Sequence, residues 1–534
     1  MKPDAITIES GSLLMTLNPD QKLWTRWLGA ESTTDSSLPP SFLAASGLNQ
    51  NDLPPLQEVH FPLAFAHQLT EDLDLLIDDS TERDLIAQSI SSLASGKARA
   101  VVTGQQPGFA GGPLYSLFKI ATAVALARLH TSEGQPAVPV FWMGDDDDDW
   151  QELLDSVFLD QNTGELKGSD LTPKPGQYRH DTIGSLPFSP LEDSTSQFIE
   201  KLQPTNELSR QLKAVYLKAK VENSTLADLT EKTLRCVFQG TGLVILRGND
   251  SRLHSHCEDF YNKAVERLPE LVEKTRVQSS HAANLFGIAP LSDNSLKRPL
   301  YLSQGKVRQP WDGQSKPEDS SSWRCGVLLR SMLQDWLLQP AAGVVGPGEL
   351  SYLCQLVPAY ECMGLARSPL VPRVFGWILP EDLPRSILEK FLHDQPLDHA
   401  RSLELAQTAG AAGEEKLVQM LTQELGLDSG RARELAAGRT RRWVKGVQAL
   451  LKNESRKQVE LNRPSRPPWV FPQGKRQERK LSWIPLVATW GQPMIDAVFE
   501  ACEKHLQDGS QGRWNDYLIR VPLPDTSNTK GSGS

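Results

Sequence analysis

Two apolar strands joined by a glycine-rich turn and a long helix constrain this chain more than any other feature. The run "RAVVTG" is rich in β-branched residues, and "AVPVFWM" at 137–143 has the same character. Between them lie "QQPGFAGG" and the helical pattern "PLYSLFKIATAVALARLH". Parallel strands need such a crossover helix, so the segment predicts a βαβ unit. We therefore expect an α/β fold with a doubly wound parallel sheet.

Later segments repeat this pattern and extend the predicted sheet. "GLVILRGND" at 242–250 and "PLVPRVF" at 369–375 predict buried strands, and "AAGVVGPGELSYLCQL" at 341–356 passes from a strand through glycines into a helix. A helix is expected from Ser80 to Ala94, because its pattern ends before Gly96. "VFLDQNTGELKG" predicts a hairpin, and helical patterns follow it.

These patterns divide the chain into three regions. Residues 1–94 form an N-terminal region packed on the core, and 95–380 form the sheet core with inserted helical and hairpin segments. Residues 381–534 are polar and poor in β-branched residues, which predicts a helical, coiled-coil-like arm and a return tail. The stripe of Leu417, Leu421 and Leu425 favours self-association into a dimer, although a two-helix hairpin could bury it internally.

Composition excludes several classes of protein. With 39% hydrophobic residues and a net charge of -10, the chain is expected to be globular and not a dedicated nucleic-acid binder. We find no run of about 18 apolar residues, so no membrane span is expected. The six cysteines form no CxxC motif, which indicates reduced thiols and a cytoplasmic location. Cys257 lies beside His254 and His256, but this short group is more typical of chance than of a metal site.

The turn "TGQQPGFAGGPLYSLFK" at 103–119 is the first candidate site. It turns on four glycines and enters a helix at Pro113. The unpaired N–H groups in the first turn of this helix would suit an anion. It matches neither GxGxxG nor GxxxxGK[ST], so no ordinary dinucleotide or P-loop assignment follows. A purely structural turn remains the alternative, although paired glutamines are not needed for one. The binding residues that we predict here are Gly104, Gln105, Gln106, Gly108, Gly112, Tyr115 and Lys119.

The run "FWMGDDDDDW" at 141–150 is the second candidate site. Five aspartates could form a solvated turn, but they directly follow a buried strand. Open α/β sheets bind their ligands at the carboxyl ends of strands, which favours a site wall. Neighbouring carboxylates raise one another's pKa, so a shared proton or a bound Mg²⁺ is compatible with the run.

Taken together, these motifs resemble the BshC family, the cysteine ligases of bacillithiol synthesis. The resemblance is carried by "VVTGQQPGFAGGPLYSLFK", "VPVFW" with its acid cluster, "GLVILRGND", Asn284-Leu285-Phe286, "VLLRSMLQDWLLQPAAGVVGPGELSYLCQL", "LVPR" and "FPQGKRQER". It covers most of residues 95–375 and the C-terminal tail. It implies a Rossmann-like core related to class I synthetases, with a C-terminal coiled coil. It also implies that cysteine is joined to glucosaminyl-malate, through an activated cysteinyl intermediate.

The chain departs from the family at the acid run. Members usually carry Glu-Asp-His-Asp after the tryptophan strand, and here Asp148 replaces the histidine. The remaining acids Asp146, Asp147 and Asp149 are the predicted catalytic residues, with Trp142 beside them on the substrate side. A histidine could shuttle a proton near neutral pH, which an ordinary aspartate does poorly.

Further residues complete the predicted site. Arg330 would bind malate carboxylates or phosphate, unless it is a surface arginine paired with Asp335. Glu349 opens a helix, where it could equally complement the helix dipole. The turn glycines Gly346 and Gly348 are assigned to the same anion-binding group, and Lys475, Arg476 and Arg479 to nucleotide contacts.

The leading hypothesis is thus an amide-forming cysteine ligase with cysteine and glucosaminyl-malate as substrates. The alternative is a family member that keeps the pocket, binds a nucleotide or aminosugar and serves as a binding or assembly protein. The missing histidine favours this alternative, and the retained glutamines, glycines and arginine favour the enzyme. The sequence establishes no cofactor, although ATP and Mg²⁺ are compatible with it, and no metal-ligand set can be assigned.

Overall fold

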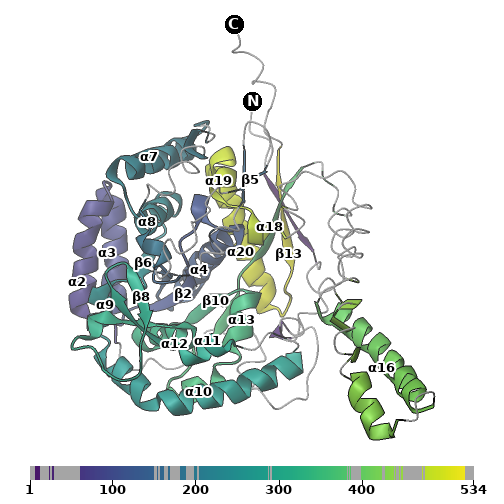
Figure 1. Cartoon of the computed structure of the whole chain (residues 1–534). Coiled ribbons are helices and arrows are strands. Elements are labelled where there is room, and N and C mark those ends of the chain that lie inside the picture. The colour runs from purple at the N-terminus through teal and green to yellow at the C-terminus, as the bar shows by residue number, and fades with distance from the viewer. Residues whose placement is uncertain are drawn as a thin grey trace. The chain divides into compact units, whose positions relative to one another are not determined.

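A five-stranded parallel sheet forms the centre of the fold in the computed structural model of the chain (Figure 1). In spatial order its strands are β11, β10, β2, β3 and β6, and all neighbours run parallel. Their bounds are Leu370–Pro372, Ala342–Val345, Arg99–Gln105, Ala137–Met143 and Val244–Arg247. In chain order this is the 3-2-1-4-5 arrangement of a Rossmann sheet, so the predicted α/β fold is confirmed.

The structure describes most of the chain. It covers residues 6–11, 23, 27–28, 60–148, 153, 157–160, 166–168, 181–187, 198–200, 202, 204–286, 288, 291–381, 383, 385, 399–423, 427–437, 439–440, 444–445, 447–448, 451, 472 and 476–522. These residues fall into two compact units, one with the described residues of 6–381 and 472–522, the other with those of 383–451. None of the described helices combines the length and apolar character that a membrane crossing requires.

The crossover helix α4, Leu114–Ser132, lies at the heart of the first unit. Nearly all of its residues are buried, because it packs on β2 and β3 and also against α20, Gln492–Ser510. This double coverage explains why its sequence is apolar on every face. The helix begins at Leu114, with Pro113 as its N-cap residue and not at the predicted first helical position.

Helices and a hairpin surround the first strands of the sheet. α2 spans Leu63–Leu76, and α3 spans Ser80–Ala94 as predicted, with Asp79 capping its first turn. The predicted hairpin is also confirmed, with β4 at Val157–Leu159 antiparallel to β5 at Leu166–Gly168. The helices that follow are α7, Glu207–Glu222, and α8, Leu226–Val237.

A long insertion separates β6 from β10. It contains α9, α10 and α11 at Ser251–Ser255, Glu258–Phe286 and Asp293–Lys297. A three-stranded antiparallel sheet that the sequence did not predict follows, with β7, β8 and β9 at Leu300–Gln304, Val307–Pro310 and Trp323–Cys325. α12, Val327–Leu338, then returns to the central sheet, and α13 and α14 at Pro347–Leu353 and Val357–Met363 follow β10.

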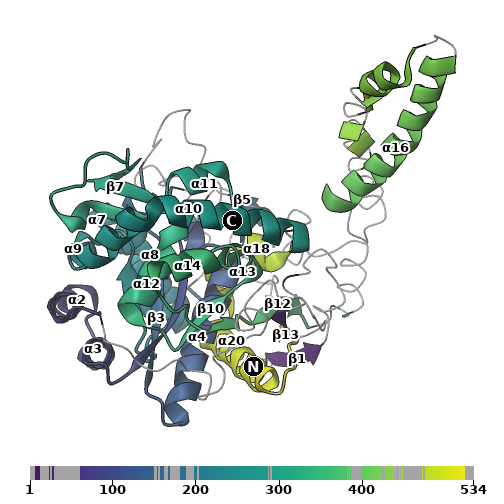
Figure 2. The same ribbon diagram turned by 90° about the horizontal axis from the view of Figure 1, so that it is seen from below.

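The C-terminal tail belongs to the same unit as the sheet. α18, Gln477–Lys480, and α19, Ile484–Trp490, precede α20. The last strand, β13 at Asp516–Val521, lies between β1 at Thr7–Gly11 and β12 at Phe375–Pro380 in a separate sheet (Figure 2). The tail therefore contributes core elements beside α4, rather than extending the arm.

The second unit is helical in its described part. α16 spans His399–Gln423, and a further helical stretch covers 429–437. Leu417 and Leu421 of the predicted stripe are half-buried, and Leu425 lies outside the described residues. The coiled coil stays a prediction.

Candidate active site

The predicted site residues converge on a cavity of about 240 Å³. It lies where β2, β3 and β10 end, at the point where the strand order reverses and open α/β sheets bind their ligands. Seven predicted residues line it: Gly104, Gln105, Gln106, Trp142, Asp147, Arg330 and Glu349. The cavity is also lined by five residues that were not among the predicted site residues: Gly144, Val327, Ser331, Gln334 and Tyr352.

Close packing explains the glycines of the first turn. A Cβ atom on Gly108 would lie 2.4 Å from the Cα atom of Gly112, so neither backbone leaves room for a side chain. Gly111 has a φ of +89° and Gly112 one of +75°, in the left-handed region that favours glycine. Gly108 and Gly112 do not line the cavity, and their role in the described structure is this close approach.

The C-terminal tail covers the start of α4. Leu114 N–H donates to the Leu481 carbonyl at 2.8 Å, and Trp483 Nε1–H donates to the Gly111 carbonyl. Trp483 N–H also donates to the Gly112 carbonyl at 3.3 Å. The helix N-terminus that the sequence suggested for an anion is therefore occupied in part by the protein's own backbone.

Lys119, on α4, contacts the end of β2 and the helix that follows β10, and it is not among the residues that line the cavity. Its side chain is only 3% exposed, and its ammonium group lies 2.9 Å from the Glu349 carboxylate. It also donates to the Gly104 carbonyl and, at 3.5 Å, to Gln105 Oε1. These acceptors use its three donors, so Lys119 orders the turn rather than offering a free cation.

Glu349 and Tyr115 hold the walls of the site in place. Glu349 accepts a hydrogen bond from Gly346 N–H at 3.0 Å, which closes the capping box of α13. It thus combines the predicted helix-terminal role with a place in the cavity wall. Tyr115 accepts a hydrogen bond from Gln105 Nε2 at 3.0 Å, which orients that amide. Gly348 leaves open space around it, and no neighbour demands a glycine there.

The acid run meets two arginines. Asp147 Oδ2 lies 2.8 Å from Arg330 Nη1, and Asp147 Oδ1 lies 3.7 Å from Arg308 Nη1. Asp146 Oδ2 lies 3.6 Å from Arg330 Nη2 and is buried. Burial opposes ionisation of Asp147, but the two guanidinium groups outweigh it and hold its pKa below the usual value. Asp148 is exposed, and Asp149 lies outside the described residues.

Arg330 therefore faces the cavity and not the surface. Its partner is Asp147, whereas Asp335 accepts hydrogen bonds from the Tyr360 hydroxyl at 2.7 Å and the Ser368 hydroxyl at 2.5 Å. The alternative surface pair between Arg330 and Asp335 is wrong. A guanidinium held at the cavity wall by the carboxylates of Asp146 and Asp147 is placed to contact an anion in the cavity.

Arg308 is a site residue that sequence reasoning missed. It is 3% exposed and comes from β8, outside the central sheet. Its guanidinium donates to the Asp146 carbonyl at 2.8 Å and the Cys325 carbonyl at 2.9 Å, and it lies 3.8 Å from the Tyr301 ring centroid. A single arginine in a short polar hairpin gives no signal of this long-range contact.

The described acids do not fit a Mg²⁺ site. Among the residues that the structure describes, no three His, Cys, Asp or Glu side chains group to hold a metal. Asp146 and Asp147 face guanidinium groups instead, which compete for the oxygens a metal would need. His254 is a packing residue, because its ring nitrogens contact the Gly248 carbonyl and the Tyr261 hydroxyl, each at 2.7 Å.

The described basic residues of this tail segment, Arg476 and Arg479, do not line the cavity. Arg476 is half-buried, Arg479 is exposed, and Lys475 lies outside the described residues. Between them, buried Glu478 forms an ion pair with Arg373 at 2.9 Å. The structure thus gives this segment a packing role beside β12, and its nucleotide contacts stay a prediction.

The family model and the most similar curated relatives agree on the family. Residues 54–310 and 313–374 match the family described as Bacillithiol biosynthesis BshC, N-terminal Rossmann-like domain. A protein named "Putative cysteine ligase BshC" from Koribacter versatilis (strain Ellin345) is 31% identical over 318 residues, which cover 55% of this chain and 57% of that protein. A protein of the same name from Shouchella clausii (strain KSM-K16) is 24% identical over 79% of this chain and 86% of its own length.

The match spans less than two thirds of the Koribacter protein's length. Among solved structures, an arginyl-tRNA synthetase from Campylobacter jejuni, described as putative, aligns over 79% of this chain and 98% of its own. Its TM-score is 0.25 and its sequence identity 11%.

Proposed function

The chain belongs to the family of Bacillithiol biosynthesis BshC, N-terminal Rossmann-like domain, and from this membership we propose that it is a ligase that joins cysteine to glucosaminyl-malate. The observation that carries the proposal is the Arg330–Asp147 pair in the cavity at the reversal point of the sheet. An arginine oriented in this way suits the two carboxylates of a malate group or the phosphate of an activated acid.

The reaction would form an amide bond between the cysteine carboxyl group and the sugar amine. The amine attacks the activated carboxyl carbon, the activating group leaves, and the amine loses a proton. ATP is the proposed activating co-reactant. The protein contributes by holding the amine close to the activated carboxyl carbon in the orientation needed for attack. The amides of Gln105 and Gln106 and the Arg330 guanidinium would orient them in the cavity.

The aspartates would act through Arg330. Asp147 has a lowered pKa, so it stays ionised and is a poor general base near neutral pH. Its proposed role, and that of buried Asp146, is to fix the direction of the guanidinium. The role of Asp149 stays a prediction, as it lies outside the described residues.

A direct assay tests this function. The purified full chain is incubated with cysteine and glucosaminyl-malate, with and without Mg-ATP, and the product thiol is measured by mass spectrometry. We expect product from the parent, and a loss of about ten- to a hundredfold in kcat/KM for Arg330→Gln. Arg267→Gln, in an arginine that is 47% exposed on α10, is the matched control and should leave the rate unchanged. No product from the parent under any condition would contradict the proposal.

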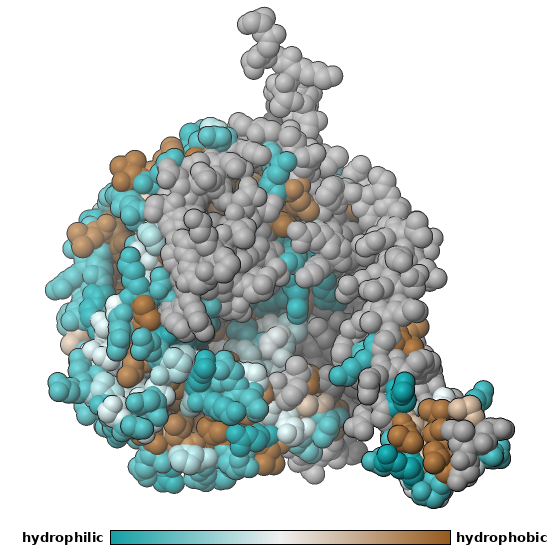
Figure 3. Space-filling model, in the orientation of Figure 1, coloured by the Kyte–Doolittle hydropathy of each residue, from teal (hydrophilic) through white to brown (hydrophobic). Residues whose placement is uncertain are grey.

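We also propose a cytoplasmic location and self-association through the second unit. All six cysteines are free thiols, as expected in a reducing compartment. On the second unit Met420 is 49% and Leu435 42% exposed, and hydrophobic residues lie together on its described surface (Figure 3). Elsewhere on the face of the molecule that Figure 3 shows, the described hydrophobic residues are scattered among hydrophilic ones. A second copy of this chain is the proposed partner of the exposed group.

A further inference from the structure

A larger cavity of about 520 Å³ lies outside the candidate active site. Helices α2 and α3, the start of α8, strand β6 and the residues after β6 line it. The acid run links the two cavities, because Asp145 lines this one and Asp147 lines the other. Its volume is in the range typical of sites for small molecules.

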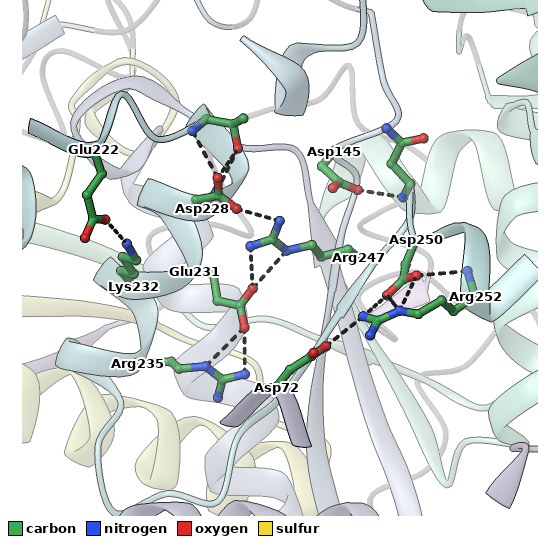
Figure 4. A network of polar contacts seen from close by, with 12 residues as sticks. Asp72, Asp145, Glu222, Asp228, Glu231, Lys232, Arg235, Arg247, Asp250 and Arg252 are labelled. Carbon is green, nitrogen blue, oxygen red and sulfur yellow. Dashed lines mark hydrogen bonds and ion pairs between the residues drawn. The ribbon is translucent and has the colours of Figure 1, made fainter. Parts of the chain in front are cut away.

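Charged residues form one wall of this cavity (Figure 4). Arg247 pairs with Asp228 and Glu231, each at 2.8 Å, and Arg252 pairs with Asp72 and Asp250, each at 2.7 Å. Arg235 also pairs with Glu231 at 2.8 Å. Five acids thus face three arginines, and four of the acids are paired. The arginines are already committed to carboxylates, so the wall has no open cation for an anionic ligand.

Asp145 is the fifth acid. No cation among the described residues lies within ion-pair distance of it, and Arg247 and Arg324 act on it only from farther away. It is 4% exposed, and its carboxyl group accepts one hydrogen bond, from Asn249 N–H at 2.8 Å. It takes part in no ion pair among the described residues. Burial, followed by the charge of Asp146, raises its pKa to about 7. A buried carboxyl group that faces a cavity without a counter-ion is costly to ionise, and a bound cation would relieve that cost.

Apolar side chains form a further part of the cavity wall. Leu73 and Leu76 of α2 and Ile86 and Ile90 of α3 line the cavity together with Val244 of β6. A bare metal ion gains nothing from such a surface, whereas an alkyl chain buries apolar area on it. The charged and the apolar parts of the wall together select a ligand with one compact positive charge and an aliphatic body.

We propose that this cavity binds an aliphatic primary amine, with the ammonium group on Asp145 and the alkyl chain on the leucine and isoleucine wall. The ammonium supplies the counter-ion that Asp145 lacks, and its further donors can reach the excess carboxylates beside it. The site does not depend on the ligase function, since no residue of its walls lines the candidate active site.

Three probes of equal length test this site at pH 8, where Asp145 is mostly ionised. Binding of pentylamine, 1-pentanol and pentanoate to the full chain is measured by calorimetry or ligand-observed NMR. Pentylamine should bind about tenfold or more tightly than 1-pentanol, because only the amine forms the charge-assisted contact, and pentanoate should bind most weakly. A preference for pentanoate, equal binding of amine and alcohol, or no binding of the amine would overturn the proposal.

A variant pair locates the binding. Asp145→Asn preserves shape and should weaken pentylamine binding about tenfold, while leaving 1-pentanol binding unchanged. Asp74→Asn is the matched control, as Asp74 lies on α2 with its side chain 76% exposed and does not line the cavity. Unchanged pentylamine affinity in Asp145→Asn would place the amine elsewhere and refute the assignment. The three-probe comparison on the parent protein is independent of how well either variant folds.

Discussion

Lys119 and Glu349 form an ion pair of 2.9 Å that joins the helices following β2 and β10. These are the two strands between which the order of the sheet reverses. The pair therefore joins α4 to α13 beside the candidate active site. Lys119 also donates to the Gly104 carbonyl at the end of β2, and Glu349 accepts from Gly346 N–H after β10. The ion pair adds to the backbone pairing of β2 with β10 and to the hydrogen bond from the Thr103 hydroxyl to the Val344 carbonyl at 3.0 Å.

Removing this bridge should destabilise the protein. Lys119→Met leaves the Glu349 carboxylate without its cation and two further acceptors, the Gly104 carbonyl and Gln105 Oε1, without this donor. This should cost about 2–3 kcal/mol of unfolding free energy. Urea unfolding followed by circular dichroism measures it. Lys504→Met, which breaks an exposed pair with Glu500, should change little. Equal effects of the two changes would show that the buried bridge is unimportant.

The pair of Asp147 and Arg330 should control turnover more than folding. Asp147→Asn keeps the volume but removes the charge that orients the guanidinium at 2.8 Å. We expect kcat/KM to fall about ten- to a hundredfold, equivalent to about 1.5–3 kcal/mol. Steady-state kinetics with glucosaminyl-malate as the varied substrate measures this. An unchanged rate in a folded variant would mean that the acid run is only a charged turn.

The buried Asp145 predicts an unusual pH dependence of stability. Its pKa is about 7 in the folded protein against an ordinary value of 3.8, so the folded state binds the extra proton between these values. Its contribution to stability is therefore full at low pH and is lost as the pH rises through 7. Asp145→Asn, which cannot ionise, should be more stable than the parent at pH 8 by about 2–4 kcal/mol at most. At pH 4 the two proteins should unfold alike, and a constant difference across this range would contradict the prediction.

Replacing Asp148 by histidine tests whether the chain has adapted to its aspartate. Asp148 is exposed, and its backbone N–H, which any residue keeps, donates to Asp147 Oδ1 at 3.0 Å. Asp148→His should leave the melting temperature unchanged and change the rate of thiol formation by less than about threefold. A gain of about tenfold or more would instead indicate that this chain has lost most of its activity and favour a binding role.

The helical unit should mediate dimer formation. Burying Leu417 and Leu421 between two copies would stabilise the dimer by about 1.5–3 kcal/mol per leucine. Sedimentation velocity at micromolar concentration should show a dimer for the parent and a monomer for Leu417→Ser combined with Leu421→Ser. The control is Leu75→Ser, in a residue of α2 that is 87% exposed in the first unit. A parent that sediments as a monomer would rule the prediction out.

Local pattern was enough to predict the central sheet. The β-branched runs of β2, β3 and β6 and the glycine turns after β2 and β10 are signals within short windows. The short strands β7, β8 and β9 lack a continuous apolar pattern, so they were missed. Strand β1 pairs only with β13, and no local pattern connects residues so far apart in the chain.

The sequence predicted which residues gather at the cavity, but not what each of them does there. The motifs brought Arg330, Asp147 and the glutamines to one cavity, as expected of residues at strand ends. They did not show that internal acceptors use all the donors of Lys119, because that depends on Glu349 of α13, more than 200 residues later in the chain. Nor did they show Arg308, whose contact with Asp146 spans 162 residues. Charge balance in a buried site is a property of the folded structure.

The contacts of Trp483 with Gly111 and Gly112 also fix when, during translation, the glycine turn can reach its final structure. The ribosome makes Gly111 372 residues before Trp483, and the other four strands of the central sheet, β3, β6, β10 and β11, are made in between. During this interval the Gly111 and Gly112 carbonyl groups and the Leu114 amide lack the partners that Trp483 and Leu481 give them in the folded protein. The sheet can therefore form before the tail has been made, but the turn beside the active site is completed only after residue 483 has been added. A nascent chain released before residue 481 would carry every arginine and aspartate of the site and still lack the segment that fixes its first turn.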